Sequence, residues 1–270
     1  MKKQNLMKLS ISLLLIIIAY LPTILWMIDR WSAKDTYYSH GFLVPFISVF
    51  LIWLKKDKLL SLKVKPDSRG WFFLAPGILI HLISAFWRIY FTSGFSLILV
   101  FAGMVLLFFG RAFLRHILFP LLFLLFMIPL PLVAIANISF KLKIFAAAIA
   151  TFIVNKVGLP AIREGSIIKT VHSYLVVEDP CSGIRSLIAL IALGALMTYL
   201  SNLSRVKKII LFSSTIPIAV GTNIIRIVAL TMVSEIYGTK YAMGFFHDAM
   251  GILVFVLAFA GLSLVQKLLE

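Results

Sequence analysis

The residues best suited to chemistry in this 270-residue chain lie in three short blocks of its second half. The first block reads Glu178-Asp179-Pro180-Cys181-Ser182-Gly183-Ile184-Arg185 and contains the single cysteine of the chain. We interpret Asp179 as a helix N-cap and Pro180 as the first helical residue, which places Cys181 in the first turn of a helix. Free backbone N–H groups and the helix dipole favour negative charge there, so the nucleophilic thiolate form of Cys181 is favoured. The alternative is a small apolar residue that fills a gap between helices.

Two further groups of residues support the cysteine in this interpretation. Arg185 follows Cys181 by four residues, so on a helix it lies one turn deeper and adds positive charge near the sulfur. Glu178 and Ser182 flank the cysteine and are supporting candidates as well.

The second block reads Asn223-Ile224-Ile225-Arg226. The guanidinium of Arg226 would stabilise a thiolate or an oxyanion through charge-assisted hydrogen bonds. Asn223 lies one helical turn before Arg226 and shares its face. The alternative is an arginine that extends its side chain to the lipid headgroups.

The third block is Phe245-Phe246-His247-Asp248-Ala249-Met250-Gly251, and it opens the last apolar segment. His247 is a candidate general acid or base for cysteine acyl transfer, and its alternative role is hydrogen bonding at a helix end. A metal site built from His40, His172, His247 and Asp248 has no supporting spacing. We therefore expect neither a metal nor a cofactor, and the motifs of zinc proteases, serine hydrolases, P-loop proteins and Rossmann folds do not occur in the sequence.

Composition decides which kind of protein must position these residues. Hydrophobic residues make up 61% of the chain and charged residues only 13%, which excludes a water-soluble domain. The net charge of +16 would suggest nucleic acid as a partner in a soluble protein. Here the basic residues lie between long apolar runs, as in membrane topology, so no nucleic-acid partner is expected. A single cysteine also rules out an intrachain disulfide.

The apolar runs predict an all-α integral membrane protein with an eight-helix transmembrane bundle. The predicted spans are residues 9–28, 39–55, 71–88, 94–110, 116–136, 182–201, 208–232 and 248–267. Residues 138–157 are interpreted as an interfacial or re-entrant helix on the outer face, because three lysines interrupt them. Residues 158–180 form a short polar segment with a hairpin around Ile167-Ile168 and Tyr174 to Val177. We expect one polytopic domain over residues 1–270.

Charge asymmetry sets the expected orientation. With the N-terminus inside, the basic loops 55–69 and 205–208 face the cytoplasm, whereas most acidic residues lie outside. Both termini are then cytoplasmic, and Cys181, Arg226 and His247 meet at the outer face.

The three blocks resemble a known family. Glu178 to Leu187, Asn223 to Arg226, and Phe246-His247 with Gly251 are similar, in this order, to the signature blocks of the exosortase and archaeosortase family of membrane transpeptidases. Further agreement lies in Tyr38-Ser39-His40-Gly41, in Met127 to Pro131 and in Arg163-Glu164-Gly165, so the resemblance covers nearly the whole chain.

The resemblance implies a multi-pass, eight-helix enzyme that processes secreted proteins at the bacterial inner membrane. Carried over residue by residue, it makes Cys181 the nucleophile, Arg226 the essential arginine and His247 the third catalytic residue. Archaeosortases have a second arginine where His247 stands, so this chain resembles the bacterial exosortase branch. Its implied partner is the C-terminal tail of a PEP-CTERM type protein, cleaved through a thioester and passed to an acceptor such as a lipid or a glycan.

Three alternatives remain open at this stage. Water as the final nucleophile would make the protein a simple thiol protease. A transporter would use Arg226, Arg185, His81 and Glu235 to line a path, although neither inverted repeats nor paired broken helices are found. A non-catalytic scaffold for envelope assembly would not need Cys181.

Overall fold

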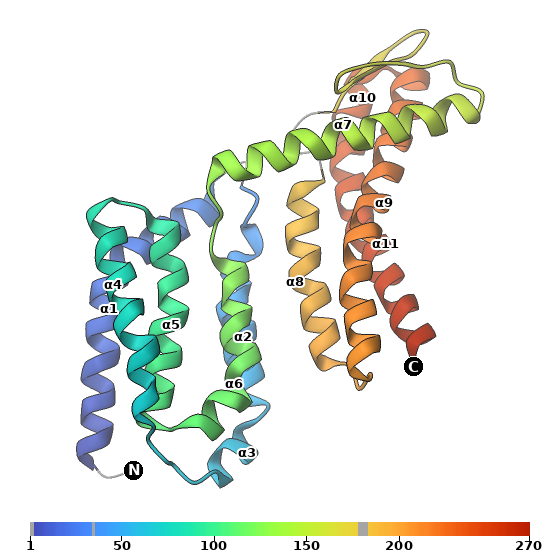
Figure 1. The fold of residues 1–270 in the computed structure, drawn as a ribbon. Coiled ribbons are helices and arrows are strands. Elements are labelled where there is room, and N and C mark those ends of the chain that lie inside the picture. The colour runs from blue at the N-terminus through green and yellow to red at the C-terminus, as the bar shows by residue number, and fades with distance from the viewer. Residues whose placement is uncertain (1–2, 34–35, 178–182) are drawn as a thin grey trace. The chain divides into compact units, whose positions relative to one another are not determined.

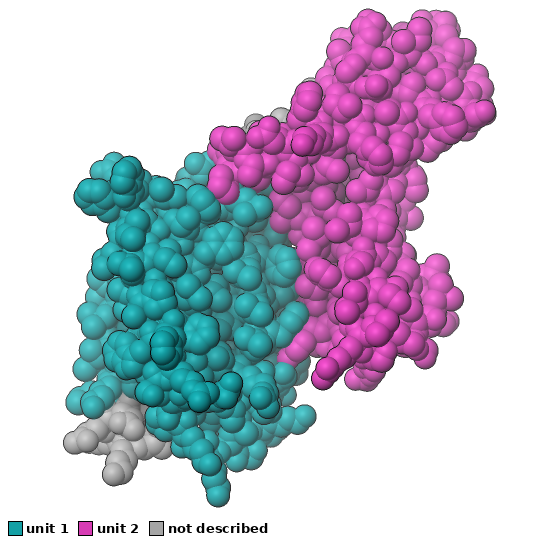
Figure 2. Space-filling view, viewed as in Figure 1, with its two compact units in different colours: residues 1–130 teal, residues 131–270 magenta. Residues whose placement is uncertain are grey.

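A computed structural model describes residues 3–33, 36–177 and 183–270 of the chain. The fold is mostly helical, with one small sheet (Figure 1). Two compact units divide it, residues 1–130 and residues 131–270 (Figure 2). The candidate catalytic and supporting residues that the structure describes, Arg185, Asn223, Arg226 and His247, all lie in the second unit.

The helices of the first unit are α1 (Lys3–Ser32), η1 (Ser39–Phe42), α2 (Leu43–Trp53), α3 (Lys56–Ser61), η2 (Ser68–Gly70), α4 (Trp71–Phe86), α5 (Tyr90–Phe108), α6 (Arg111–Phe123) and η3 (Leu124–Met127). The second unit contains α7 (Leu132–Lys156), β1 (Ile162–Glu164), β2 (Ile167–Lys169), β3 (Tyr174–Val176), α8 (Ile184–Leu200), α9 (Arg205–Tyr237), α10 (Thr239–Ala242) and α11 (Phe245–Leu269).

Six helical segments among the described residues are long and apolar enough to cross a membrane: Met7–Ser32, Ser68–Phe86, Tyr90–Phe108, Leu132–Lys156, Arg205–Tyr237 and Phe246–Leu269. Five of them contain or closely match predicted spans. Two other predicted spans correspond to shorter apolar helices, Ser39–Trp53 and Ile184–Leu200. The expectation of a mostly helical, multi-pass membrane protein is therefore confirmed at this level.

The predicted span 116–136 is wrong, because no single helix covers it. Helix α6 ends at Phe123 and continues as the 3-10 turn η3, after which Ile128 is extended with ψ 114°. Pro129 explains the break, since the residue before a proline is disfavoured in helical conformation. A new helix, α7, begins directly after Pro131.

The segment predicted as an interfacial helix, residues 138–157, forms most of α7. This helix starts at Leu132, and its length and composition qualify it as a span. An interfacial position for it stays a prediction.

Polar side chains tie the helices of the first unit together. The Tyr20 hydroxyl lies 2.7 Å from Ser96 Oγ, and Thr23 Oγ1 lies 2.7 Å from Ser93 Oγ. Ser93 Oγ is also 2.9 Å from His81 Nδ1. Hydrogen bonds between buried side chains hold membrane helices in register, so His81 joins helices here.

Helix α9 is the centre of the second unit and contacts α7, α8, α10, α11 and β3. In Figure 1, α8 and α11 lie beside it. Small residues allow these close approaches: a Cβ atom built on Gly194 of α8 would lie 2.2 Å from Thr215 Oγ1 of α9. Leu190, Ala219 and Ala258 form a buried cluster where α8, α9 and α11 meet.

The predicted hairpin is confirmed and extended by one strand. Strands β1, β2 and β3 form an antiparallel sheet in that order, with Ile168 opposite both Arg163 and Leu175. Ile168, Leu175 and Val177 are buried in one cluster with Ile224 and Ile227 of α9. The sheet thus packs its apolar face on the part of α9 that contains Arg226.

Candidate active site

Arg226 lies in the C-terminal half of α9 and is only 8% exposed. A cation at membrane depth is unfavourable unless nearby groups hydrogen-bond to it, which is why such residues are usually functional. Three of its neighbours on α9, Asn223, Ile224 and Ile227, are buried, and the exposed neighbour Ile225 is apolar. The guanidinium therefore needs partners from another element.

His247, in the first turn of α11, is such a partner. Arg226 Nη2 lies 2.9 Å from His247 Nε2 and donates a 3.3 Å hydrogen bond to the His247 carbonyl oxygen. The sequence-predicted pair is thus brought together across 21 residues of chain. Gly251, one turn further along α11, borders the guanidinium: a Cβ atom there would lie 3.8 Å from Nη2, an ordinary van der Waals distance.

This contact fixes the state of the imidazole. An arginine guanidinium has only donors, so His247 Nε2 must accept the hydrogen bond with its lone pair. The ring proton of a neutral His247 then lies on Nδ1, which is 3.3 Å from Asp248 Oδ1. His247 is consequently positioned to hold Arg226, and Asp248 favours the tautomer that does so.

The chain enters α8 directly against the same face of α9. Gly183, the N-cap of α8, has a left-handed conformation with φ 81°. A Cβ atom built on it would lie 2.7 Å from both Cγ and Nδ2 of Asn223, so only glycine fits here. Asn223 is 2% exposed and one helical turn from Arg226.

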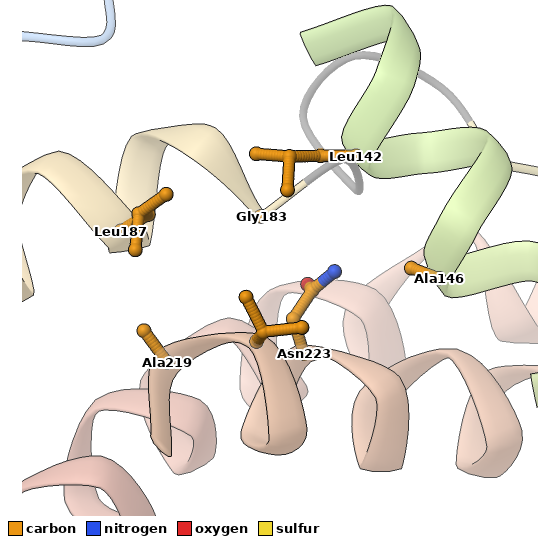
Figure 3. A pocket seen from close by; sticks show the side chains of 7 residues that line it. Leu142, Ala146, Gly183, Leu187, Ala219 and Asn223 are labelled. Atoms are coloured by element: carbon orange, nitrogen blue, oxygen red, sulfur yellow. The ribbon is translucent and has the colours of Figure 1, made fainter. Parts of the chain in front are cut away.

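A small cavity of about 10 Å³ opens at this contact, with room for about one water molecule. Its lining residues are Leu142, Ala146, Gly183, Leu187, Ala219, Val220 and Asn223. Figure 3 shows the Asn223 side chain projecting from α9 into the space between these elements. Among the described residues of that lining, Asn223 alone has a polar side chain, and its amide is available to an entering polar atom.

The expected start of the cysteine helix is wrong. Helix α8 begins at Ile184, and it does not continue back through Gly183, because a positive φ is incompatible with a right-handed helix. The helical turn predicted to follow Pro180 is therefore not the first turn of α8. Glu178, Cys181 and Ser182 lie outside the described residues, as do Asp179 and Pro180.

Arg185 lies in the first turn of α8, two residues after Gly183. Its Nε atom is buried and has no hydrogen-bond partner within the part of the chain that the structure describes. The predicted role of this arginine, adding positive charge near the sulfur of Cys181, stays a prediction.

One cluster near the site was not predicted. The carboxylate of Glu235, near the end of α9, accepts hydrogen bonds from Thr170 Oγ1 at 2.6 Å and from the His172 backbone N–H at 3.2 Å. Glu235 Oε1 also lies 2.8 Å from His172 Nδ1. We call these three residues the Glu235 clasp. Sequence reasoning considered Glu235 only as lining of a transport path, and its partners lie more than 60 residues away, so no local signal indicated the contact.

The clasp fixes the turn before β3, and β3 leads to the cysteine block. Thr239 Oγ1 donates a 3.0 Å hydrogen bond to the Tyr174 carbonyl of the same strand. Val177, the last described residue before the block, is buried in the cluster that includes Ile224 and Ile227. Val177 and Gly183, the nearest described residues before and after Cys181 in the sequence, are therefore packed against α9.

A comparison with protein families matches residues 26–264 to the family described as transmembrane exosortase. The chain belongs to the transmembrane exosortase family. The matched range includes all three blocks and most of both units, so the family assignment covers the site and its scaffold. Comparisons with curated proteins and with solved structures found no match. Membership in the exosortase family indicates a multi-pass membrane transpeptidase or protease of the sorting type.

We expect Gly183→Ala to destabilise this exosortase more than Gly165→Ala does. Both glycines have positive φ, 81° and 61°, so both variants carry a backbone penalty of about 1–2 kcal/mol. Only the alanine at position 183 also collides with buried Asn223, whereas nothing lies within 4 Å of the Cβ position at Gly165. Thermal unfolding of the purified variants in detergent measures the difference. Equal losses of Tm would show that the Asn223 contact does not constrain Gly183.

Proposed function

We propose that this exosortase is a cysteine transpeptidase that cleaves the C-terminal sorting tail of secreted proteins, of the PEP-CTERM type, and transfers the protein to an acceptor. Cys181 is the nucleophile, and Arg226 and His247 are its catalytic partners. The observation that carries this proposal is the buried guanidinium of Arg226, held by His247 beside the point where the chain enters α8.

Chain geometry supports a role for Cys181 at this place. The cysteine precedes Gly183 by two residues, and two residues of chain reach at most about 7 Å. Gly183 is packed on Asn223, which lies one turn from Arg226. On the other side of the block, Val177 packs on the same helix. A nucleophile between two such anchors has less conformational freedom to lose when it attacks, which favours the reaction.

The proposed reaction has two steps. The thiolate of Cys181 attacks the carbonyl carbon of the scissile peptide bond, forming a C–S bond and a tetrahedral oxyanion. The C–N bond then breaks, the amine of the departing tail takes up from water the equivalent of the proton that the thiol lost on ionisation, and a thioester remains. An acceptor nucleophile attacks the thioester, forms its own bond to the carbonyl carbon and releases the thiol.

Arg226 is suited to stabilise the oxyanion. Its charge is preorganised, because His247 holds Nη2, and it is buried, where electrostatic interactions are stronger than in water. His247 supports this step by orienting the guanidinium. The geometry favours that role over proton transfer from Nε2, whose lone pair is already engaged by Arg226.

The proposal includes the finer topology expected from the sequence. Cytoplasmic termini and an active site at the outer face of the bacterial inner membrane would present the site to a tail that is anchored by its own membrane helix. A lipid or a glycan is the proposed acceptor. Water in its place would give a simple thiol protease, which is the second candidate function.

The test is co-expression with a tail-bearing secreted protein from the same genome, with tail removal followed on a gel. We expect wild type to remove the tail and Cys181→Ser to leave it attached. Arg226→Lys should slow removal by about 100-fold or more, because a lysine ammonium does not reproduce the fixed fork of donors. Arg205→Lys, at the exposed start of α9, is the matched control and should cleave normally.

Mass spectrometry of the products then separates the two candidate functions. A new bond at the freed carboxyl end supports transfer, and a free carboxylate supports the protease. Equal tail removal by wild type and Cys181→Ser would remove Cys181 as the nucleophile and contradict both.

A pair of His247 variants tests its orienting role. In His247→Gln the side-chain oxygen lies where Nε2 was and still accepts from Arg226, so we expect most of the activity to remain, with an unchanged pH profile. His247→Ala removes the partner of a buried charge and should lose activity strongly. The two variants are compared by initial rates of tail removal between pH 6 and pH 8. Inactivity of a well-folded His247→Gln would instead assign proton transfer to His247.

A further inference from the structure

An apolar groove on the first unit runs between α1, α4 and α5, far in sequence from the candidate active site. These three helices lie side by side in Figure 1. The groove encloses about 560 Å³, within the range of small-molecule sites. Its lining residues are Lys8, Ile11, Ser12, Leu15, Ile16, Trp71, Leu74, Ile78, Met104, Leu107 and Phe108.

The lining of the groove changes from charged and aromatic at one end to mostly apolar along the rest. Lys8, Trp71 and Phe108 lie at the start of α1, the start of α4 and the end of α5, so they share one end of the groove. From Lys8 to Ile16, α1 rises by about 12 Å, and all but one of the lining side chains along the way are apolar. Lysine and tryptophan are the residues that mark the boundary between hydrocarbon and headgroups.

Additional cations gather at the same end. The loop before α4 is fixed there by backbone hydrogen bonds from Lys65 N to the Phe109 oxygen and from Asp67 N to the Leu106 oxygen. Lys65 and Arg69 of this loop are exposed, as is Lys8. Within the described part of the first unit, none of these three cations takes part in an ion pair. Asp67 is the only acid in this loop, and its side chain accepts from Arg69 N.

We propose that the groove binds a membrane phospholipid with an anionic headgroup. One acyl chain lies along the apolar floor formed by α1, α4 and α5, and the phosphate faces Lys8 and Arg69. Clustered Lys and Arg residues at the end of membrane helices attract anionic lipids, and a groove between helices selects a bound lipid from the bulk. A peptide is a poorer fit, because among the described lining residues only Ser12 and Trp71 have uncharged side chains that form hydrogen bonds.

The closing experiment uses the full chain in nanodiscs that contain phosphatidylglycerol with a photoreactive acyl chain. Peptide mapping after illumination should place the cross-links on residues 11–16, 74–78 and 104–108. The same label in phosphatidylcholine should mark these peptides much less. Lys8→Gln should weaken phosphatidylglycerol labelling by about fivefold, the effect of one cation near an anionic lipid surface.

A matched pair of variants keeps the test specific. Ser12→Phe fills the groove and should abolish labelling of all three peptides, whereas Leu14→Phe changes a 58% exposed residue of α1 outside the lining and should not. Labelling spread evenly over all apolar helices, or unaffected by Ser12→Phe, would overturn the proposal, and so would equal labelling by the two lipids. Tail removal in the same nanodiscs reports separately on the proposed enzyme function.

Discussion

The hydrogen bond between Arg226 and His247 is the interaction on which the rest of the site depends. A charged side chain in the middle of a membrane helix is unfavourable by about 2.5–3.5 kcal/mol, so α9 tolerates Arg226 only where partners reach it. His247 supplies both a ring nitrogen and a carbonyl oxygen at one point of α11. The same contact leaves the positive charge immobile and directed, which is the property that stabilisation of an oxyanion requires.

Other elements of the second unit, among them α8 and the sheet, hold the chain in place around Arg226 and His247. Gly183 brings the start of α8 against Asn223, and the sheet packs Val177 on Ile224 and Ile227. The Glu235 clasp holds the turn that precedes β3. Helix α9 thus acts as a common support for the residues before and after the cysteine block, and for the cation that would face it. In the proposed reaction, packing on both sides of Cys181 reduces the conformational freedom that the nucleophile loses on attack.

Much of this site could be predicted from residue types and spacing, because polar blocks stand out in an apolar chain. The pairing of Arg226 with His247 was expected in outline, since the predicted spans put both residues near helix ends on the same side of the membrane. The start of α8 was predicted wrongly. Gly183 has a left-handed conformation, so α8 begins after it and does not reach back to Pro180. The prediction of a span over residues 116–136 was wrong because Pro129 breaks the helix. The Glu235 clasp could not be predicted because it depends on contacts between residues distant in sequence.

The most direct test of the account is the tautomer of His247, measured by nitrogen NMR of protein with labelled histidine in detergent. The chain has five histidines, so comparison with His247→Gln assigns the signal. The account predicts a ring with its proton on Nδ1 and a hydrogen-bonded, unprotonated Nε2, and a changed Nε2 signal in Arg226→Lys. A ring protonated on Nε2, in either the neutral or the charged form, would contradict it, because Arg226 would then have no acceptor on the imidazole.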